Sequence, residues 1–112
     1  MIHPLKYNRR KSRKVFIGDI PLGSSEKIRL QSMTNTDTSD IEKTAEQVIE
    51  IVEAGAEYVR ITVQTSNVAE NIPLIKSKIE ERGFDIPLIA DIHFSPKAAE
   101  ISARYIEKVR IN

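Results

Sequence analysis

The residues of this sequence whose types could do chemistry stand within three short segments, always at the same alternating position. In residues 58–63, 88–93 and 108–112, apolar side chains occupy every second position. The alternate positions hold Arg60, Thr62, Asp91, His93, Arg110 and Asn112. Successive side chains of a β-strand point to opposite faces of its sheet. We therefore expect the apolar positions to pack under helices and the polar positions to gather on the other face.

The charges on this polar face do not balance, because Arg60 and Arg110 are opposed by Asp91 alone. A buried guanidinium needs a partner, since an unpaired buried charge is costly. One interpretation is that Asp91 bridges both arginines and only stabilises the fold, as many ion-pair networks do. The other is that the surplus positive charge binds an anion. A diphosphate would suit arginine, whose planar donors bind phosphate oxygens in pairs.

His93 and a cluster after the first apolar segment are further candidates. His93 could donate a hydrogen bond or a proton, although a single histidine is often just a satisfied polar group. Thr34, Asn35 and Thr36 are weaker candidates, because such clusters after strands usually form turns and caps. Gly-rich phosphate loops, serine nucleophile motifs and HExxH pairs are absent from the sequence. The pattern alone therefore indicates an anion-binding site of unknown chemistry.

Strands and helices must alternate to position these residues. The β-rich runs 15–20 and 27–31 predict a hairpin that turns at residues 21–25 and leads into a strand ending near Met33. Residues 39–42 have the form of a capping box, and the spacing predicts a helix over 40–54 that Gly55 ends.

The second half of the chain continues the alternation. A strand is predicted over 58–63, followed by a helical stretch to about Arg82 that restarts after Asn71, because proline at position 73 is tolerated only in a first helical turn. Further predicted elements are a strand over 86–92, a helix that begins at Ser95 and Pro96 and runs to about Tyr105, and a strand over 108–112.

This order predicts an α/β fold, the first half of a (β/α)8 TIM barrel: an N-terminal β-hairpin, then four strands alternating with helices. Short connections favour parallel strands, in either a barrel or a doubly wound sheet. Such a barrel needs eight strands and about 250 residues, and its active site lies at the carboxyl ends of the strands. We expect residues 1–14 to be a basic arm and residues 15–112 to be the N-terminal part of the barrel domain.

Composition excludes several classes of protein. The chain has no cysteine, so no thiolate in it can hold a metal or an iron–sulfur cluster. Residues 1–14 carry six of the 17 basic residues and no acidic one, so the remainder has 11 − 16 = −5. We expect no nucleic-acid binding, because the arm has one aromatic residue and no recognition motif follows it. No apolar run of membrane-spanning length is present, so we expect a soluble, cytoplasmic protein without a membrane partner.

Four motifs together resemble a known enzyme family. They are QSMTNT at residues 31–36, Gly55-Ala56 followed by Val59-Arg60, ADIHF at residues 90–94 and RIN at residues 110–112. Their order and spacing are similar to the strand-end motifs of the 4-hydroxy-3-methylbut-2-enyl diphosphate synthase family. The basic residues before the hairpin are also similar, so the resemblance covers essentially the whole chain.

The resemblance implies a reductive ring-opening of 2-C-methyl-D-erythritol 2,4-cyclodiphosphate to 4-hydroxy-3-methylbut-2-enyl diphosphate, in the non-mevalonate route to isoprenoids. Reduced ferredoxin or flavodoxin supplies the electrons in that family. A [4Fe–4S] cluster carries them, held by three cysteines and a glutamate of a separate C-terminal domain that closes over the partner's barrel in a homodimer. By this resemblance, the chain is expected to be an N-terminal fragment that binds no cluster and is inactive alone.

The family's site residues carry over to matching positions of this chain. By resemblance, Arg60 and Arg110 would bind the diphosphate, Asn112 and Asn35 would also bind substrate, and His93 and Asp91 would be catalytic, Asp91 by orienting its neighbours. No metal ligand is expected. Two alternatives stay open: another anion-binding TIM barrel, of the pterin-binding-synthase type, and a non-catalytic binding or assembly module.

Overall fold

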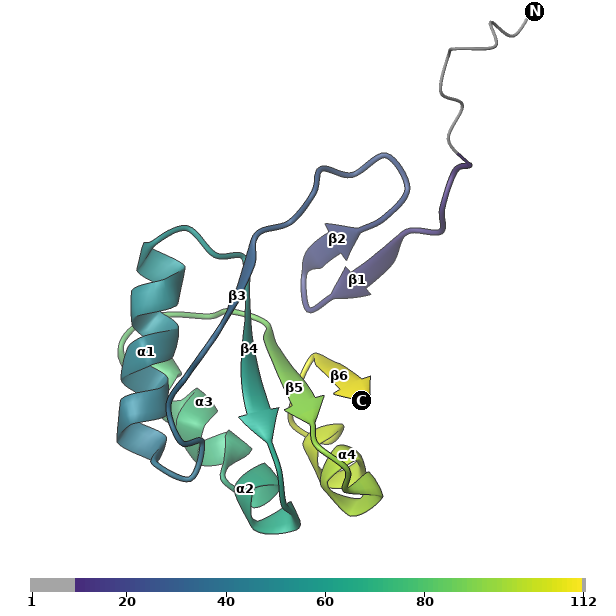
Figure 1. Cartoon of the computed structure of the whole chain (residues 1–112). Coiled ribbons are helices and arrows are strands. Elements are labelled where there is room, and N and C mark those ends of the chain that lie inside the picture. Colours follow the sequence, from purple (N-terminus) through teal and green to yellow (C-terminus); the bar gives the residue numbers. More distant parts are fainter. Residues whose placement is uncertain (1–9, 112) are drawn as a thin grey trace, which may run out of the picture.

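A computed structural model describes residues 10–111, in which four parallel strands, a separate hairpin and four helices alternate along the chain (Figure 1). The elements, in chain order, are β1 (Val15–Ile17), β2 (Ile20–Leu22), β3 (Gln31–Met33), α1 (Ile41–Glu53), β4 (Tyr58–Val63), α2 (Ser66–Glu70), α3 (Ile72–Glu81), β5 (Leu88–Ile92), α4 (Pro96–Ser102) and β6 (Lys108–Ile111). The predicted alternation of strand and helix is confirmed over these residues.

The main sheet has the strand order β3-β4-β5-β6, and all neighbouring strands are parallel. Its register places Arg60 between Met33 and Ile89 on the two flanking strands. One step further along, Asp91 lies between Thr62 and Arg110. The register therefore brings the predicted polar positions of adjacent strands to one region of the sheet.

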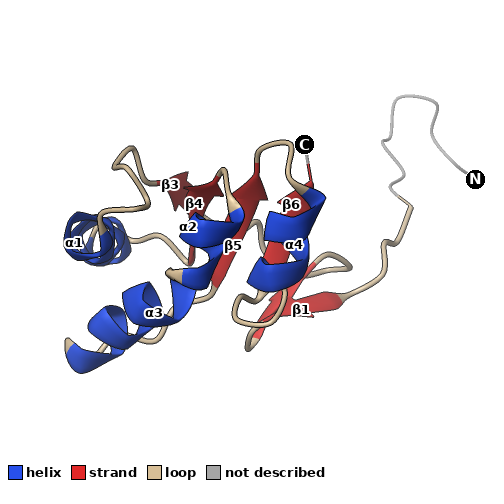
Figure 2. Cartoon of the chain, turned by 90° about the horizontal axis from the view of Figure 1, so that it is seen from below, coloured by secondary structure: helices blue, strands red, loops and turns tan. Residues whose placement is uncertain are grey.

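The core lies between this sheet and the helices, on the face that the sequence predicted to be apolar. Val59, Ile61 and Val63 of β4 are fully buried, and the apolar positions of β5 join them in one cluster with side chains from all four helices. Helices α1 and α3 lie side by side on it (Figure 2). Ile111 was also predicted to lie under helices but is 79% exposed, because β6 is the outer strand of the described sheet.

The helices begin and end close to the predicted positions. Helix α1 differs at its start: its N-cap is Asp40, whose side chain accepts a hydrogen bond from the backbone N of Lys43, whereas Ser39 bonds to Asp37. The capping box predicted at Ser39 is therefore wrong by one residue. The predicted break before Pro73 is confirmed, since Asn71 separates α2 from α3. Within residues 10–111, none of the helices is long and apolar enough to cross a membrane.

The hairpin turns earlier than predicted. Strands β1 and β2 pair antiparallel around Gly18 and Asp19, with Ile17 opposite Ile20, so residues 21 and 22 belong to a strand and not to the turn. Gly18 has a φ of +60°, and glycine at the first central position of a two-residue loop suits the twist of a hairpin. The prediction gave Pro21 and Gly23 more weight than this shorter turn signal.

The hairpin covers the amino end of the sheet face that lies opposite the helices. Ile17 forms a small buried cluster there with Tyr58 and Ile89. Arg29 fixes the following segment, because it donates hydrogen bonds to the carbonyl of Pro21 and to Glu57. Figure 1 shows the hairpin beside the ends where the parallel strands begin. The carboxyl ends of the strands lie at the opposite end of this face.

The packing of the core yields a first prediction. Ile61→Val should lower the free energy of unfolding of the 112-residue chain by about 0.5–1.5 kcal/mol, because one methylene is removed from a fully buried side chain. Urea denaturation followed by circular dichroism measures this loss. The matched control is Ile28→Val at an exposed position, which should change stability by less than about 0.5 kcal/mol. Equal losses in the two variants would contradict the assignment of the core.

Candidate functional site

Asp91 lies at the centre of a charged cluster near the carboxyl end of β5. Its side chain is 5% exposed, and its Oδ1 accepts a hydrogen bond of 2.8 Å from Nη1 of Arg110 on the neighbouring strand. Its Oδ2 lies 3.7 Å from Nε of Arg60 and 3.5 Å from Nε2 of His93. The carboxylate of Asp91 thus contacts Arg60, His93 and Arg110, which are all predicted site residues.

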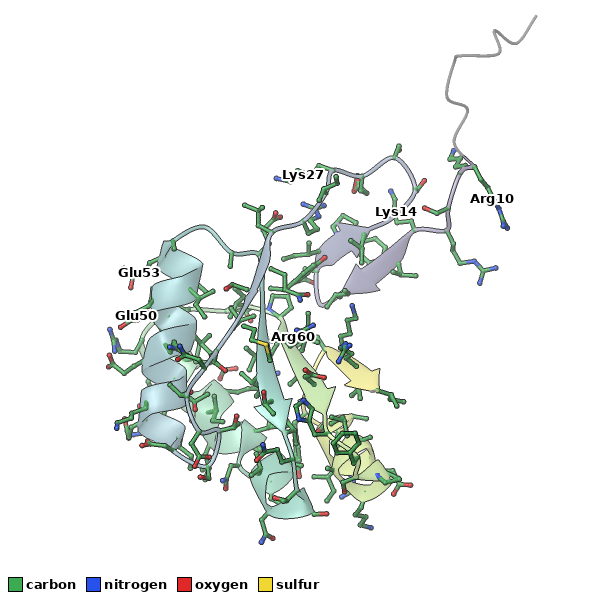
Figure 3. The ribbon with its side chains drawn as sticks, viewed as in Figure 1. Arg10, Lys14, Lys27, Glu50, Glu53 and Arg60 are labelled. Atoms are coloured by element: carbon green, nitrogen blue, oxygen red, sulfur yellow. The ribbon has the colours of Figure 1, made fainter. Side chains whose placement is uncertain are left out.

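Arg60 is held between two neighbouring strands, and part of its hydrogen-bonding capacity is unused. Its Nη2 donates to Sδ of Met33 at 3.4 Å, which is a contact with a weak acceptor. Its Nε is buried and has no hydrogen-bond partner, since the carboxylate of Asp91 is beyond hydrogen-bonding distance. The side chain lies over the parallel sheet (Figure 3). The side chain is 27% exposed, and a partly exposed guanidinium whose only hydrogen bond among the described residues goes to sulfur is suited to an anionic ligand.

The electrostatics of the cluster favour the ionised form of Asp91. Burial raises the pKa of this carboxyl group, but the hydrogen bond and the charge of Arg110, the hydrogen bond of His93 and the charge of Arg60 together outweigh it. The net result is a pKa below the usual value for aspartate. Asp91 is therefore a fixed negative charge at neutral pH, and it cannot serve as a proton donor there.

His93 continues the alternation of β5 beyond the end of the strand. Its backbone N donates to the carbonyl of Val63, which extends the pairing of β4 with β5 by one residue. This places its ring on the same face as Asp91, at the carboxyl end of the sheet. The next residue, Phe94, has a φ of +66° and is almost fully exposed, and the two rings lie 5.9 Å apart. His93 is thus partly exposed and accessible to a ligand.

Asn35 lies in a separate part of the structure, beside a cavity. The cavity has a volume of about 360 Å³ and is lined by residues 34–38 together with Thr62, Gln64 and Val68. Gln47 of α1 accepts a hydrogen bond from the backbone N of Asn35 and donates one to its Oδ1. The structure gives Asn35 no contact with the Asp91 cluster. Asn112 lies outside the described residues.

Part of this arrangement was not predicted from the sequence. Met33 contacts Arg60, and Gln64 lines the cavity, but neither was a candidate. Gln64 could have been found from the two-residue period, because it follows Arg60 and Thr62 on the same face. Thr38 also lines the cavity and carries no comparable signal, because it lies in an irregular loop. Asp91 contacts both arginines, which is the geometry of the interpretation in which it bridges them.

The residues of this chain do not fit an iron–sulfur cluster. The sequence has no cysteine, and residues 10–111 bring together no group of three or more histidine, aspartate or glutamate side chains that could hold a metal ion. Thiolates are the usual ligands of such clusters. Any cluster that acts with this site would need ligands from another part of a longer protein.

Comparisons with known proteins show what this chain is similar to. A family model described as the GcpE TIM-barrel domain matches residues 12–112. A similar protein of Phocaeicola vulgatus, named 4-hydroxy-3-methylbut-2-en-1-yl diphosphate synthase (flavodoxin), is 52% identical over 106 residues. A protein of Oryza sativa subsp. japonica, named 4-hydroxy-3-methylbut-2-en-1-yl diphosphate synthase (ferredoxin), chloroplastic, is 46% identical over 104 residues. The predicted α/β fold of TIM-barrel type is confirmed by the family match and the parallel sheet.

These relatives are much longer than the chain. The two alignments cover 95% and 93% of this chain but 17% and 14% of the relatives. The chain therefore spans about a sixth of the length of the curated relatives that it matches.

The charged cluster yields a second prediction. In Arg110→Ala, the pKa of Asp91 should rise, because burial still disfavours the carboxylate while its shortest hydrogen bond is lost. A carbon-13 titration of the carboxyl groups by NMR measures this. Asp37 is an internal control, because the hydroxyl and backbone N of Ser39 lower its pKa and should do so equally in the variant. An unchanged pKa of Asp91 would contradict the arrangement.

Proposed function

The chain belongs to the GcpE TIM-barrel family, and from this premise we propose that it forms part of an oxidoreductase of isoprenoid biosynthesis. The reaction would be the reductive conversion of 2-C-methyl-D-erythritol 2,4-cyclodiphosphate to 4-hydroxy-3-methylbut-2-enyl diphosphate. The names of the relatives support the product of this reaction. Because the chain spans about a sixth of their length, the activity would be that of a protein as long as these relatives. Residues 15–112 would be the N-terminal part of its barrel, preceded by a basic arm.

The main support for the proposal is the charge balance of the Asp91 cluster. Arg60 and Arg110 face a single carboxylate, so the cluster keeps a surplus positive charge. The side chain of Arg60 is 27% exposed and its one hydrogen bond within residues 10–111 goes to the sulfur of Met33, and the side chain of Arg110 is 46% exposed. Both guanidinium groups therefore retain donors for a ligand. A diphosphate supplies acceptor oxygens and negative charge, which match these donors and this charge.

The remaining site residues would act around the bound diphosphate. Asp91 would hold both guanidinium groups in place, because it contacts each of them and stays ionised. His93 would donate a hydrogen bond or a proton to the substrate from the carboxyl end of the sheet. Asn112 would bind the substrate next to Arg110, and Asn35 would bind it from the cavity. In TIM barrels, such residues at the carboxyl ends of strands form the active site.

Electrons and their cofactor would come from outside this chain. A [4Fe–4S] cluster would require thiolate ligands that these 112 residues do not have. We propose that another part of the longer protein holds it and that flavodoxin or ferredoxin reduces it. The names of the relatives specify one or the other of these donors. A homodimer in the cytoplasm completes the proposal, with no nucleic acid or membrane as a partner.

The diphosphate site yields a third prediction. Arg60→Ala should weaken binding of the cyclodiphosphate by about 2–5 kcal/mol, as expected when one member of a buried charge pair is lost. Arg110→Ala should have a smaller effect, because this side chain is more exposed than that of Arg60. Anaerobic calorimetric titration of the cyclodiphosphate into each full-length variant measures both losses of affinity. Arg82→Ala, which removes an exposed ion pair with Glu46, is the control and should bind normally. Unchanged affinity in both site variants would reject the diphosphate role.

The role of His93 yields a fourth prediction. In the full-length protein, His93→Ala should lower kcat by more than about 10²-fold, as expected for loss of a proton donor, while the Tm changes little. Anaerobic turnover with reduced flavodoxin or ferredoxin, together with thermal denaturation, measures the two quantities. A variant that simply unfolds would make His93 structural. If the full-length wild-type protein does not turn over the cyclodiphosphate, the proposed reaction itself is rejected.

A further inference from the structure

The cavity beside Asn35 is not explained by diphosphate binding at the arginines. It lies at the carboxyl ends of β3 and β4, and its volume of about 360 Å³ is in the range of small-molecule sites. We propose that this cavity binds the neutral, hydroxyl-bearing part of the substrate, and hence a ligand of the small-polyol class. This inference rests on the proposed function for the identity of the substrate. The observations on the cavity itself are independent of it.

Two buried hydroxyl groups in the wall of the cavity have no partner. Thr34 and Thr38 are 4% and 5% exposed, and the structure gives neither Oγ1 a hydrogen bond. Buried polar groups are hydrogen-bonded in the great majority of cases, and an unpaired one is costly. Both oxygens are covered in the structure, so each hydroxyl group would reach a ligand in the cavity only after rotation about χ1. Threonine is suited to this, because it has more than one accessible χ1 rotamer.

The rest of the wall favours a neutral ligand over an anion. Its other hydrogen-bonding groups include the hydroxyl of Thr62 and the amide of Gln64, which are uncharged. Gln47 donates a hydrogen bond to Oδ1 of Asn35, which leaves the amide nitrogen of Asn35 free to donate. The carboxylate of Asp37 also lines the cavity, and its lowered pKa keeps it negative at neutral pH. A phosphate would be repelled here, whereas a hydroxyl group can donate to Asp37.

The cavity borders the charged cluster through one strand pair. Thr62 lines the cavity and lies directly opposite Asp91 in the register of β4 and β5. Thr62 and Arg60 also share one face of β4 and are two residues apart, about 7 Å along a strand. A ligand with a diphosphate at one end and hydroxyl groups at the other would therefore reach both sites at once.

The test uses a probe without phosphate. The 112-residue chain, labelled with nitrogen-15, is titrated with 2-C-methyl-D-erythritol and followed by NMR. Saturable shifts are expected for the amides of residues 34–38, 62 and 64. The double variant Thr34→Val, Thr38→Val keeps the shape of both side chains and should raise the Kd of the polyol at least about tenfold, because two hydrogen bonds to the ligand are lost. Gln64→Ala, at an exposed position, is a second variant that should also weaken binding.

The control is Ser102→Ala. It removes another buried hydroxyl group without a partner, but one that does not line the cavity, and polyol binding should be unchanged. The inference would be overturned if the amides of residues 34–38, 62 and 64 show no saturable shift. It would also be overturned if the wild type and both cavity variants bind the polyol equally well, and buried water would then be the partner of the hydroxyl groups. A parallel titration with inorganic diphosphate tests the arginines separately, so failure of the diphosphate site and failure of the polyol site give different results.

Discussion

The two-residue alternation of the parallel strands is the constraint on which both the core and the candidate site depend. In β4 and β5, one set of alternate side chains fills the space under the helices, and the other set carries Arg60, Thr62, Asp91 and, just past the strand, His93. A shift of either strand by one residue would exchange the two sets, placing charges in the core and isoleucines in the site. The energy that holds the apolar set in place therefore also holds the register of the charged cluster. The site needs no separate framework, because the packing of the opposite face provides it.

The same alternation explains which features could be predicted from the sequence. Periodicity was sufficient for α1 and β4, where local propensity and tertiary packing agree, and Pro73 was sufficient for the break at Asn71. It also predicted that Arg60, Asp91 and Arg110 share one face, because strand parity determines which residues lie on the same side of a sheet. The turn at Gly18 was missed, because the stronger proline and glycine signals nearby pointed elsewhere. The position of Asn35 was beyond prediction, because it depends on the contact with Gln47 across an irregular loop. Loops lack a period, and their side chains are placed by tertiary contacts.

Charge and hydrogen bonding divide the carboxyl end of this sheet into two regions of different chemistry. Around Asp91, two guanidinium groups exceed the available negative charge, and the carboxylate keeps them in position. Around residues 34–38, the groups are neutral or negative, and two hydroxyl groups have no partner. Thr62 connects the regions through its position opposite Asp91. A ligand with a uniform charge distribution would suit only one of them. The contrast between the regions would therefore orient a ligand that is anionic at one end only.

The hairpin at the amino end of the strands blocks one route by which a ligand could reach the site. Ile17, Tyr58 and Ile89 close that end of the face with a buried apolar cluster, and the bonds from Arg29 to the carbonyl of Pro21 and to Glu57 hold the segment after the hairpin against it. A small molecule cannot pass through a packed cluster of this kind without opening it. A ligand at the charged cluster must therefore arrive and depart without crossing the amino end of this face.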